Sequence, residues 1–85
     1  MYVYFIGTGI TKGHQVKIGV AKDVEKRLKG MQTGNPHKLI ILAKIPCDSR
    51  RHALHLEATL HERFKKDRMT GEWFRGHISF NKLFD

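Results

Sequence analysis

The chain has 85 residues, of which 16 are Lys or Arg and 8 are Asp or Glu, and its formal net charge is +8. This length excludes two domains, because most domains need roughly 50 residues or more, so we expect one domain over residues 1–85. Hydrophobic residues make up 40% of the chain and charged residues 28%, close to the globular average, which excludes wholesale disorder. The sequence therefore predicts a folded and strongly basic domain.

The cysteine content and the lengths of the apolar runs indicate the cellular compartment of the protein. The single cysteine, Cys47, can neither form an internal disulfide nor anchor a multi-cysteine zinc site. No apolar run approaches the roughly 18 residues that span a bilayer. The apolar residues 1–6 lack the basic segment and the length of a signal peptide. We therefore expect a cytoplasmic protein with no membrane partner.

The positive charge is concentrated in the first half of the chain. Residues 1–46 carry eight Lys or Arg against two acidic residues, whereas residues 47–85 carry eight against six. A local surplus of this kind is typical of a surface that neutralises phosphates and releases their counterions. The alternative is a solvated face that only keeps the protein soluble. The composition favours a nucleic acid as the partner.

The first half of the chain predicts a hairpin followed by a helix. Residues 2–6 are aromatic or β-branched and predict a strand, and residues 16–20 predict a second strand that a glycine-rich loop separates from the first. Asp23 is a candidate N-cap, and apolar residues follow it at the spacing of one buried helical stripe. This helix should end near residues 33–34, where a glycine precedes Asn-Pro.

The second half predicts one more strand and one more helix. Residues 39–43 form an apolar run that predicts a buried strand closed by Pro46. A helix should begin at residue 48 or 49 and end near residue 66, and residues 78–84 form a short amphipathic tail. The order β-β-α-β-α plus a tail predicts an α+β fold, in which a three-stranded sheet and two helices form two layers.

Glu57 and His61 are the first candidates for chemistry. They are four residues apart on the second helix and so lie on one face. Glu57 lies beside the apolar stripe of this helix, where an ionised carboxylate is costly unless it is paired or bound to a metal. It is therefore a candidate ligand for a hard divalent cation such as magnesium. The alternatives are a surface salt bridge for Glu57 and a structural, interfacial role for His61.

Three further side chains could join Glu57. Tyr4 and Lys17 lie on the two strands of the predicted hairpin, and Arg27 comes one residue before a buried position of the first helix. Together they would place a phenol, an ammonium, a guanidinium and a carboxylate in one site. Taken singly, each has a structural alternative: a core tyrosine, a solvated lysine and a surface arginine.

Several short sequence features follow one another along the chain: VYFI at 3–6, KIG at 17–19, an arginine at 27, LEATLHERF at 56–64 and GEWF at 71–74. In these features the chain resembles the GIY-YIG nuclease superfamily, in the branch found in phage proteins and fungal meiotically up-regulated proteins. The resemblance covers about residues 2–75. The combination is specific, whereas each motif alone is not. A lysine replaces the second tyrosine of the family pattern, and such a lysine occurs within the superfamily.

The resemblance implies a fold, an activity and a set of site residues. The fold is a three-stranded antiparallel sheet flanked by helices, in agreement with the order of elements above. The activity is hydrolysis of DNA phosphodiester bonds by an endonuclease that uses one Mg²⁺ or Mn²⁺ ion. The implied catalytic residues are Tyr4, Lys17, Arg27 and Glu57, with Glu57 as the metal ligand. Asn81 is the candidate for the late asparagine of the family.

Phosphodiester hydrolysis gives each of these side chains a physical role. Tyr4 would accept a proton from the attacking water or orient it, and an adjacent Lys17 ammonium would favour its phenolate. Arg27 would hold a non-bridging phosphate oxygen with paired donors. Glu57 would hold the metal on the leaving-group side. His61 is an accessory candidate, in contact with phosphate or supporting Glu57.

DNA is the expected partner, in a bacterial or phage-infected cell and near the nucleoid when bound. The candidate DNA contacts are Lys12, Lys22, Lys26 and Lys29. A chain of this length leaves no room for a separate DNA-binding domain, so we expect a targeting protein, a homo-oligomer or DNA shape to select the substrate. Trp73 and Phe74 are expected in the core, with base stacking as the alternative. An inactive nucleic-acid-binding module and a small protein-interaction domain are the alternative functions.

Overall fold

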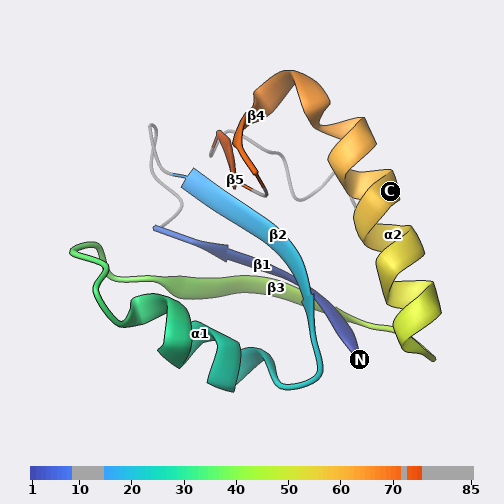
Figure 1. Cartoon of the computed structure of the whole chain (residues 1–85), viewed down its shortest axis with the longest axis horizontal. Helices are drawn as coiled ribbons and strands as arrows, with labels where there is room; N and C mark the ends of the chain where they lie inside the picture. The colour runs from blue at the N-terminus through green and yellow to red at the C-terminus, as the bar shows by residue number, and fades with distance from the viewer. Residues whose placement is uncertain (9–14, 72, 76–85) are drawn as a thin grey trace.

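The structure is a computed structural model of the whole chain and describes residues 1–8, 15–71 and 73–75 (Figure 1). Its elements are β1 (Tyr2–Gly7), β2 (Gln15–Ala21), α1 (Val24–Gln32), β3 (Ile40–Pro46), α2 (Arg50–Arg63), a 3-10 turn η1 (Lys65–Asp67), β4 (Arg68–Thr70) and β5 (Trp73–Arg75). The α+β class predicted from the sequence is confirmed. The predicted amphipathic tail at residues 78–84, together with Lys12 and Asn81, lies outside the described residues.

The strands form one antiparallel sheet in the order β3-β1-β2-β5-β4. The predicted hairpin is confirmed, with Tyr4 opposite Gly19 and Phe5 opposite Ile18. Pro46 is the last residue of β3, which is an edge strand, where a residue without an N–H is tolerated. The prediction of three strands is wrong, because the described part of the chain holds five.

The two additional strands form a short hairpin after α2. Each has three residues, and Gly71 between them has a φ of +57°, a left-handed conformation that favours glycine. The Nε of Arg68 donates a hydrogen bond of 2.6 Å to the carbonyl of Gly71. Strand β5 pairs with β2 only over Gln15, Val16 and Lys17. The hairpin therefore covers the first half of β2 and no more.

The sheet separates two apolar clusters, because successive side chains of a strand point to opposite faces. One cluster joins Val3, Phe5, Val16, Ile18 and Phe74 to Ala53 and Leu60 of α2. The other joins Tyr4, Ile6, Ala21 and Leu39 to Val24 of α1. Figure 1 shows the helices apart from each other, with α1 below the strands and α2 beside β2. The predicted two-layer arrangement is therefore wrong, and the sheet is the middle of three layers.

Asp23 caps α1 as predicted, and Ser49, one of the two residues predicted for the start of the second helix, caps α2. The Oδ1 of Asp23 accepts a hydrogen bond of 3.1 Å from the backbone N–H of Lys26, and the Oγ of Ser49 accepts one of 3.1 Å from that of His52. The second helix ends at Arg63 rather than near residue 66, because the chain turns into the 3-10 helix η1. Neither described helix is long and apolar enough to cross a membrane.

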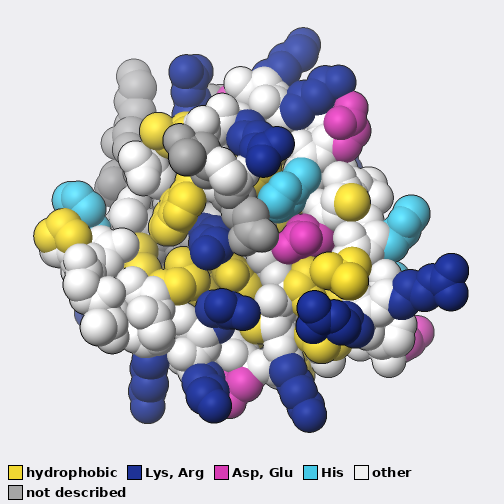
Figure 2. All heavy atoms as spheres, in the orientation of Figure 1, with side chains coloured by type: hydrophobic (Ala, Val, Ile, Leu, Met, Phe, Trp, Pro, Cys, Tyr) yellow, Lys and Arg dark blue, Asp and Glu magenta, His cyan; other side chains and the backbone are white. Residues whose placement is uncertain are grey.

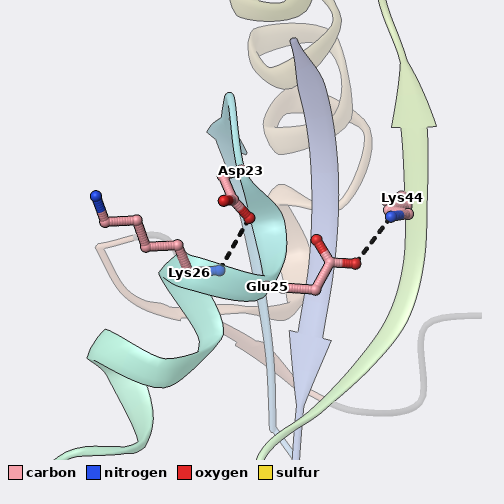
Figure 3. Close-up of polar contacts among 4 residues, drawn as sticks. All are labelled: Asp23, Glu25, Lys26 and Lys44. Atoms are coloured by element: carbon pink, nitrogen blue, oxygen red, sulfur yellow. Dashed lines mark hydrogen bonds and ion pairs between the residues drawn. The ribbon is translucent and has the colours of Figure 1, made fainter.

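An exposed ion pair connects α1 to the edge strand β3 (Figure 3). The Nζ of Lys44 lies 2.9 Å from Oε1 of Glu25 and 5.2 Å from the centroid of the Tyr2 ring. The hydrogen bond from Lys44 lowers the pKa of Glu25 below its ordinary value of 4.5. The hydrogen bond to Glu25 raises the pKa of Lys44 above 10.5.

Replacement of Glu25 by glutamine should give a small, pH-dependent loss of stability. A lowered folded-state pKa means that the pair stabilises the fold above the unfolded value of 4.5. This contribution disappears as the pH falls through the lowered value and Glu25 is protonated. Thermal unfolding of both proteins at about pH 7 and below about pH 3 measures it. A difference in melting temperature that stays equally large at the low pH would contradict this origin.

Candidate active site

A pocket opens along the edge of β2 that the β4–β5 hairpin leaves uncovered. Beyond Lys17, no strand in the described part of the chain pairs with this edge of β2. The pocket has a volume of about 620 Å³ and lies between α1 and α2. Because it lies at a sheet edge, side chains from both faces of the sheet can enter it.

The four residues predicted to act together all line this pocket. Tyr4 comes from β1, Lys17 from β2, Arg27 from α1 and Glu57 from α2. The tyrosine is 2% exposed, Lys17 and Glu57 are half-buried, and Arg27 is exposed. The structure thus brings together a phenol, an ammonium, a guanidinium and a carboxylate from four different elements.

The position of Tyr4 depends on the glycine opposite it. The two residues pair across β1 and β2, and the Tyr4 ring lies over the Gly19 backbone. A Cβ built on Gly19 would lie 2.6 Å from Cζ of Tyr4 and closer still to its hydroxyl oxygen. This close approach is why the KIG motif needs glycine at its third position, since its backbone does not have a positive φ. Gly19 therefore leaves the space that the tyrosine ring occupies beside β2.

Glu57 is the residue that could hold a metal ion. No group of three or more His, Cys, Asp or Glu side chains within the described ranges could bind one by itself. Mg²⁺ is usually held by one or two carboxylates, with waters and substrate phosphates as its other ligands. A single half-buried carboxylate in an open pocket fits a metal that arrives with a phosphate substrate. This donor set does not fit a metal held by protein groups alone.

His61 fastens α2 to the uncovered edge of β2. Its Nε2 lies 3.0 Å from the carbonyl oxygen of Ile18, and its ring meets that of Phe74 edge-on at 5.0 Å between centroids. A carbonyl only accepts, so Nε2 carries the proton and donates this hydrogen bond. His61 does not line the pocket. It lies one turn after Glu57 and fixes the position of that turn against the strand.

A comparison with known families identifies the protein family of the chain. The sequence model of the T5orf172 domain matches residues 1–83. The chain belongs to the T5orf172 domain family. This family is related to phage and GIY-YIG-like nuclease-type domains. No curated protein and no solved structure matches the chain.

In this T5orf172 domain the pocket also includes residues that the sequence interpretation did not place there. They are Val20, Arg50, Leu54, Gly71 and Trp73. Arg50, Leu54 and Glu57 recur at i, i+4 and i+7 on α2. That spacing puts them on one helical face and is the signal that could have identified Arg50.

The aromatic pair of the GEWF segment divides between the core and the pocket. Phe74 is fully buried in the cluster below α2, as predicted. Trp73 pairs with Lys17 across β5 and β2, packs partly against the other cluster and lines the pocket. The prediction of a core position is therefore confirmed for Phe74 and confirmed only in part for Trp73.

The face around the pocket of the T5orf172 domain is cationic. Lys17, Arg27 and Arg50 line the pocket with a single carboxylate, Glu57. The lysines predicted to contact DNA are all exposed where the structure describes them, namely Lys22, Lys26 and Lys29. Figure 2 shows Lys and Arg side chains around acidic and histidine side chains in the middle of this face. The arrangement suits a polyanionic ligand.

Proposed function

We propose that this T5orf172 domain is an endonuclease that hydrolyses DNA phosphodiester bonds with a single divalent metal ion. The observation that carries the proposal is the meeting of Tyr4, Lys17, Arg27 and Glu57 at one pocket. Hydrolysis of a phosphodiester needs a proton acceptor for water, cations for the charge that develops on phosphate, and stabilisation of the departing oxygen. These four side chains supply the proton acceptor and the cations, and the metal ion that Glu57 would hold supplies the stabilisation of the departing oxygen.

Each side chain contributes a separate step. Tyr4 orients the attacking water and accepts its proton, and the ammonium of Lys17 favours the phenolate form that can do so. Arg27 directs its donors to the non-bridging oxygens, whose negative charge grows in the transition state. Glu57 would hold Mg²⁺ or Mn²⁺, and the bound ion supplies electrostatic stabilisation of the phosphate and the departing oxygen.

Nicking of a supercoiled plasmid tests the activity and the role of Glu57 together. We expect the wild-type protein to nick the plasmid with Mg²⁺ or Mn²⁺ and to stop when a chelator removes the metal. Glu57→Gln keeps the size of the side chain and removes its charge, so it should slow nicking by about 100-fold or more. The measured quantity is the initial rate of conversion to open-circular DNA.

Glu62→Gln is the matched control for this experiment. Glu62 lies on the same helix, is exposed and pairs with Lys65 at 2.8 Å, and it does not line the pocket. Its replacement should leave the nicking rate unchanged. Equal nicking by the Glu57→Gln and wild-type proteins would overturn the assignment of Glu57 and point to a contaminating nuclease.

A nucleic-acid-binding module without turnover is the second candidate. The cationic residues around the pocket favour it, because they attract phosphates whether or not a bond is cut. Such a module would bind DNA with a strong salt dependence, and a chelator would not change this binding. It would not cleave DNA whichever metal ion was supplied. Cleavage that is lost in Glu57→Gln excludes this candidate.

A further inference from the structure

A second cavity adjoins the pocket of the candidate active site. Its volume is about 700 Å³, within the range of small-molecule sites. Val20, Arg27 and Arg50 line both hollows, so the two lie next to each other. The second one extends along α1 and the end of β2, away from Glu57. We call this second hollow the α1 cavity.

The α1 cavity combines an apolar floor with a cationic rim. The floor comes from Met1, Val20, Ala21 and Met31, and the rim from Lys22, Lys26, Arg27 and Arg50. Asp23 is the one acidic residue in its described lining, and Oδ1 of this carboxylate caps α1.

The cations of this rim are available to a ligand. In the described part of the chain, none of the four forms an ion pair with an acidic side chain. Figure 3 shows the Lys26 side chain extending away from the Glu25–Lys44 pair. A ligand that carries negative charge next to an apolar body matches such a surface.

We propose that the α1 cavity holds the nucleotide next to the scissile phosphate, with its base on the apolar floor and its phosphate against the lysines of the rim. The inference rests on the proposed function, because the shared Arg27 and Arg50 place the occupant beside the phosphate that is cut. A nucleotide is a flat aromatic base, whose ring faces pack on apolar side chains, joined to an anionic phosphate. Its chemistry therefore fits both parts of the cavity.

This occupant restricts the substrate. A base in a continuous duplex is stacked and paired, and only its edges are accessible in the grooves. A base that lies on Met1 and Met31 must have left the stack. The preferred substrate is therefore DNA with an unpaired nucleotide at the cut, as in a single strand, a flap or a bulge. An uninterrupted duplex should bind more weakly, because a base pair must first open.

Gly30 offers a way to fill the cavity without disturbing the fold. It lies on the same face of α1 as Lys26 and Arg27, lines the cavity, and a Cβ added to it meets nothing within 4 Å. Gly30→Leu therefore extends a side chain into the space that the base would occupy. Ala58→Leu is the matched control, since Ala58 is exposed on α2 and lines neither hollow.

The experiment measures binding of three labelled oligonucleotides of one sequence: a duplex, a duplex with a one-nucleotide bulge, and a single strand. A chelator is present throughout, so that binding is measured without cleavage. We expect the wild-type protein and Ala58→Leu to bind the bulged and single-stranded DNA about tenfold more tightly than the duplex. In Gly30→Leu this ratio should fall close to one.

The possible results test the nucleotide-binding role of the α1 cavity separately from the proposed nuclease activity. Equal wild-type affinity for the three oligonucleotides would overturn the nucleotide-binding role of the α1 cavity. A preference that persists in Gly30→Leu would also overturn it, because the base would then lie elsewhere. If the preference is lost in Gly30→Leu while no metal supports cutting by the wild type, the cavity is supported and the nuclease activity is overturned.

Discussion

Arg27→Lys should slow DNA cleavage by about 100-fold while leaving DNA affinity nearly unchanged. The guanidinium carries a fork of donors that can bind two phosphate oxygens at once, whereas an ammonium is a point charge. The substitution keeps the positive charge that attracts DNA and removes only this geometry. Arg27 is exposed and lines both the pocket and the α1 cavity, so its replacement leaves the core intact.

Single-turnover cleavage with protein in excess over DNA separates this effect from binding. Lys29→Gln is the control on the same helix, because Lys29 is exposed and lines neither the pocket nor the α1 cavity. It should weaken binding slightly through the lost charge, with an unchanged rate at saturation. Wild-type cleavage rates in Arg27→Lys would show that Arg27 supplies charge alone.

The parts of the fold that local chemistry determines could be predicted. Asp23 as an N-cap, the apolar spacing of the two helices and the hairpin of β1 and β2 are all present in the structure. Each depends on residues close together in the chain, through capping, turn composition or periodicity. The α+β class follows from their order.

The parts of the fold that long-range packing determines could not be predicted from the sequence. Strands β4 and β5 have three residues each, too few to show a period-2 pattern, and they form because Trp73 and Phe74 pair with β2. The two-layer prediction was wrong for a similar reason. Both faces of β1 are buried, so its apolar run contains no alternation to show that a helix covers each face.

The sequence named residues that line the candidate site, but it did not show where in the fold they meet. Family resemblance pointed to Tyr4, Lys17, Arg27 and Glu57, and the structure gathers them, although their catalytic roles remain proposals. Their meeting point is the edge of β2 beyond Lys17, where the unpredicted hairpin stops and no strand among the described residues pairs with β2. Placing the site therefore required the length of a strand that the sequence does not reveal.

Gly19→Ala should destabilise the protein by about 1–3 kcal/mol and should also reduce cleavage. The added methyl group cannot fit beneath the Tyr4 ring, and this ring is buried in the core at 2% exposure. Either the ring leaves its position or β1 and β2 move apart, and both responses displace the phenol from the pocket. Denaturant unfolding followed by circular dichroism measures the loss of stability.

Two comparisons identify contact with Tyr4 as the cause. Gly30→Ala makes the same chemical change in the last turn of α1, where nothing lies within 4 Å, and should stabilise the fold by up to about 1 kcal/mol. In a Tyr4→Leu background the ring is gone, so adding Gly19→Ala should cost much less than it does in the wild type. Strictly additive costs would show that the glycine is needed for something other than the tyrosine. A reduced cost would tie the KIG glycine directly to the placement of the proposed catalytic phenol.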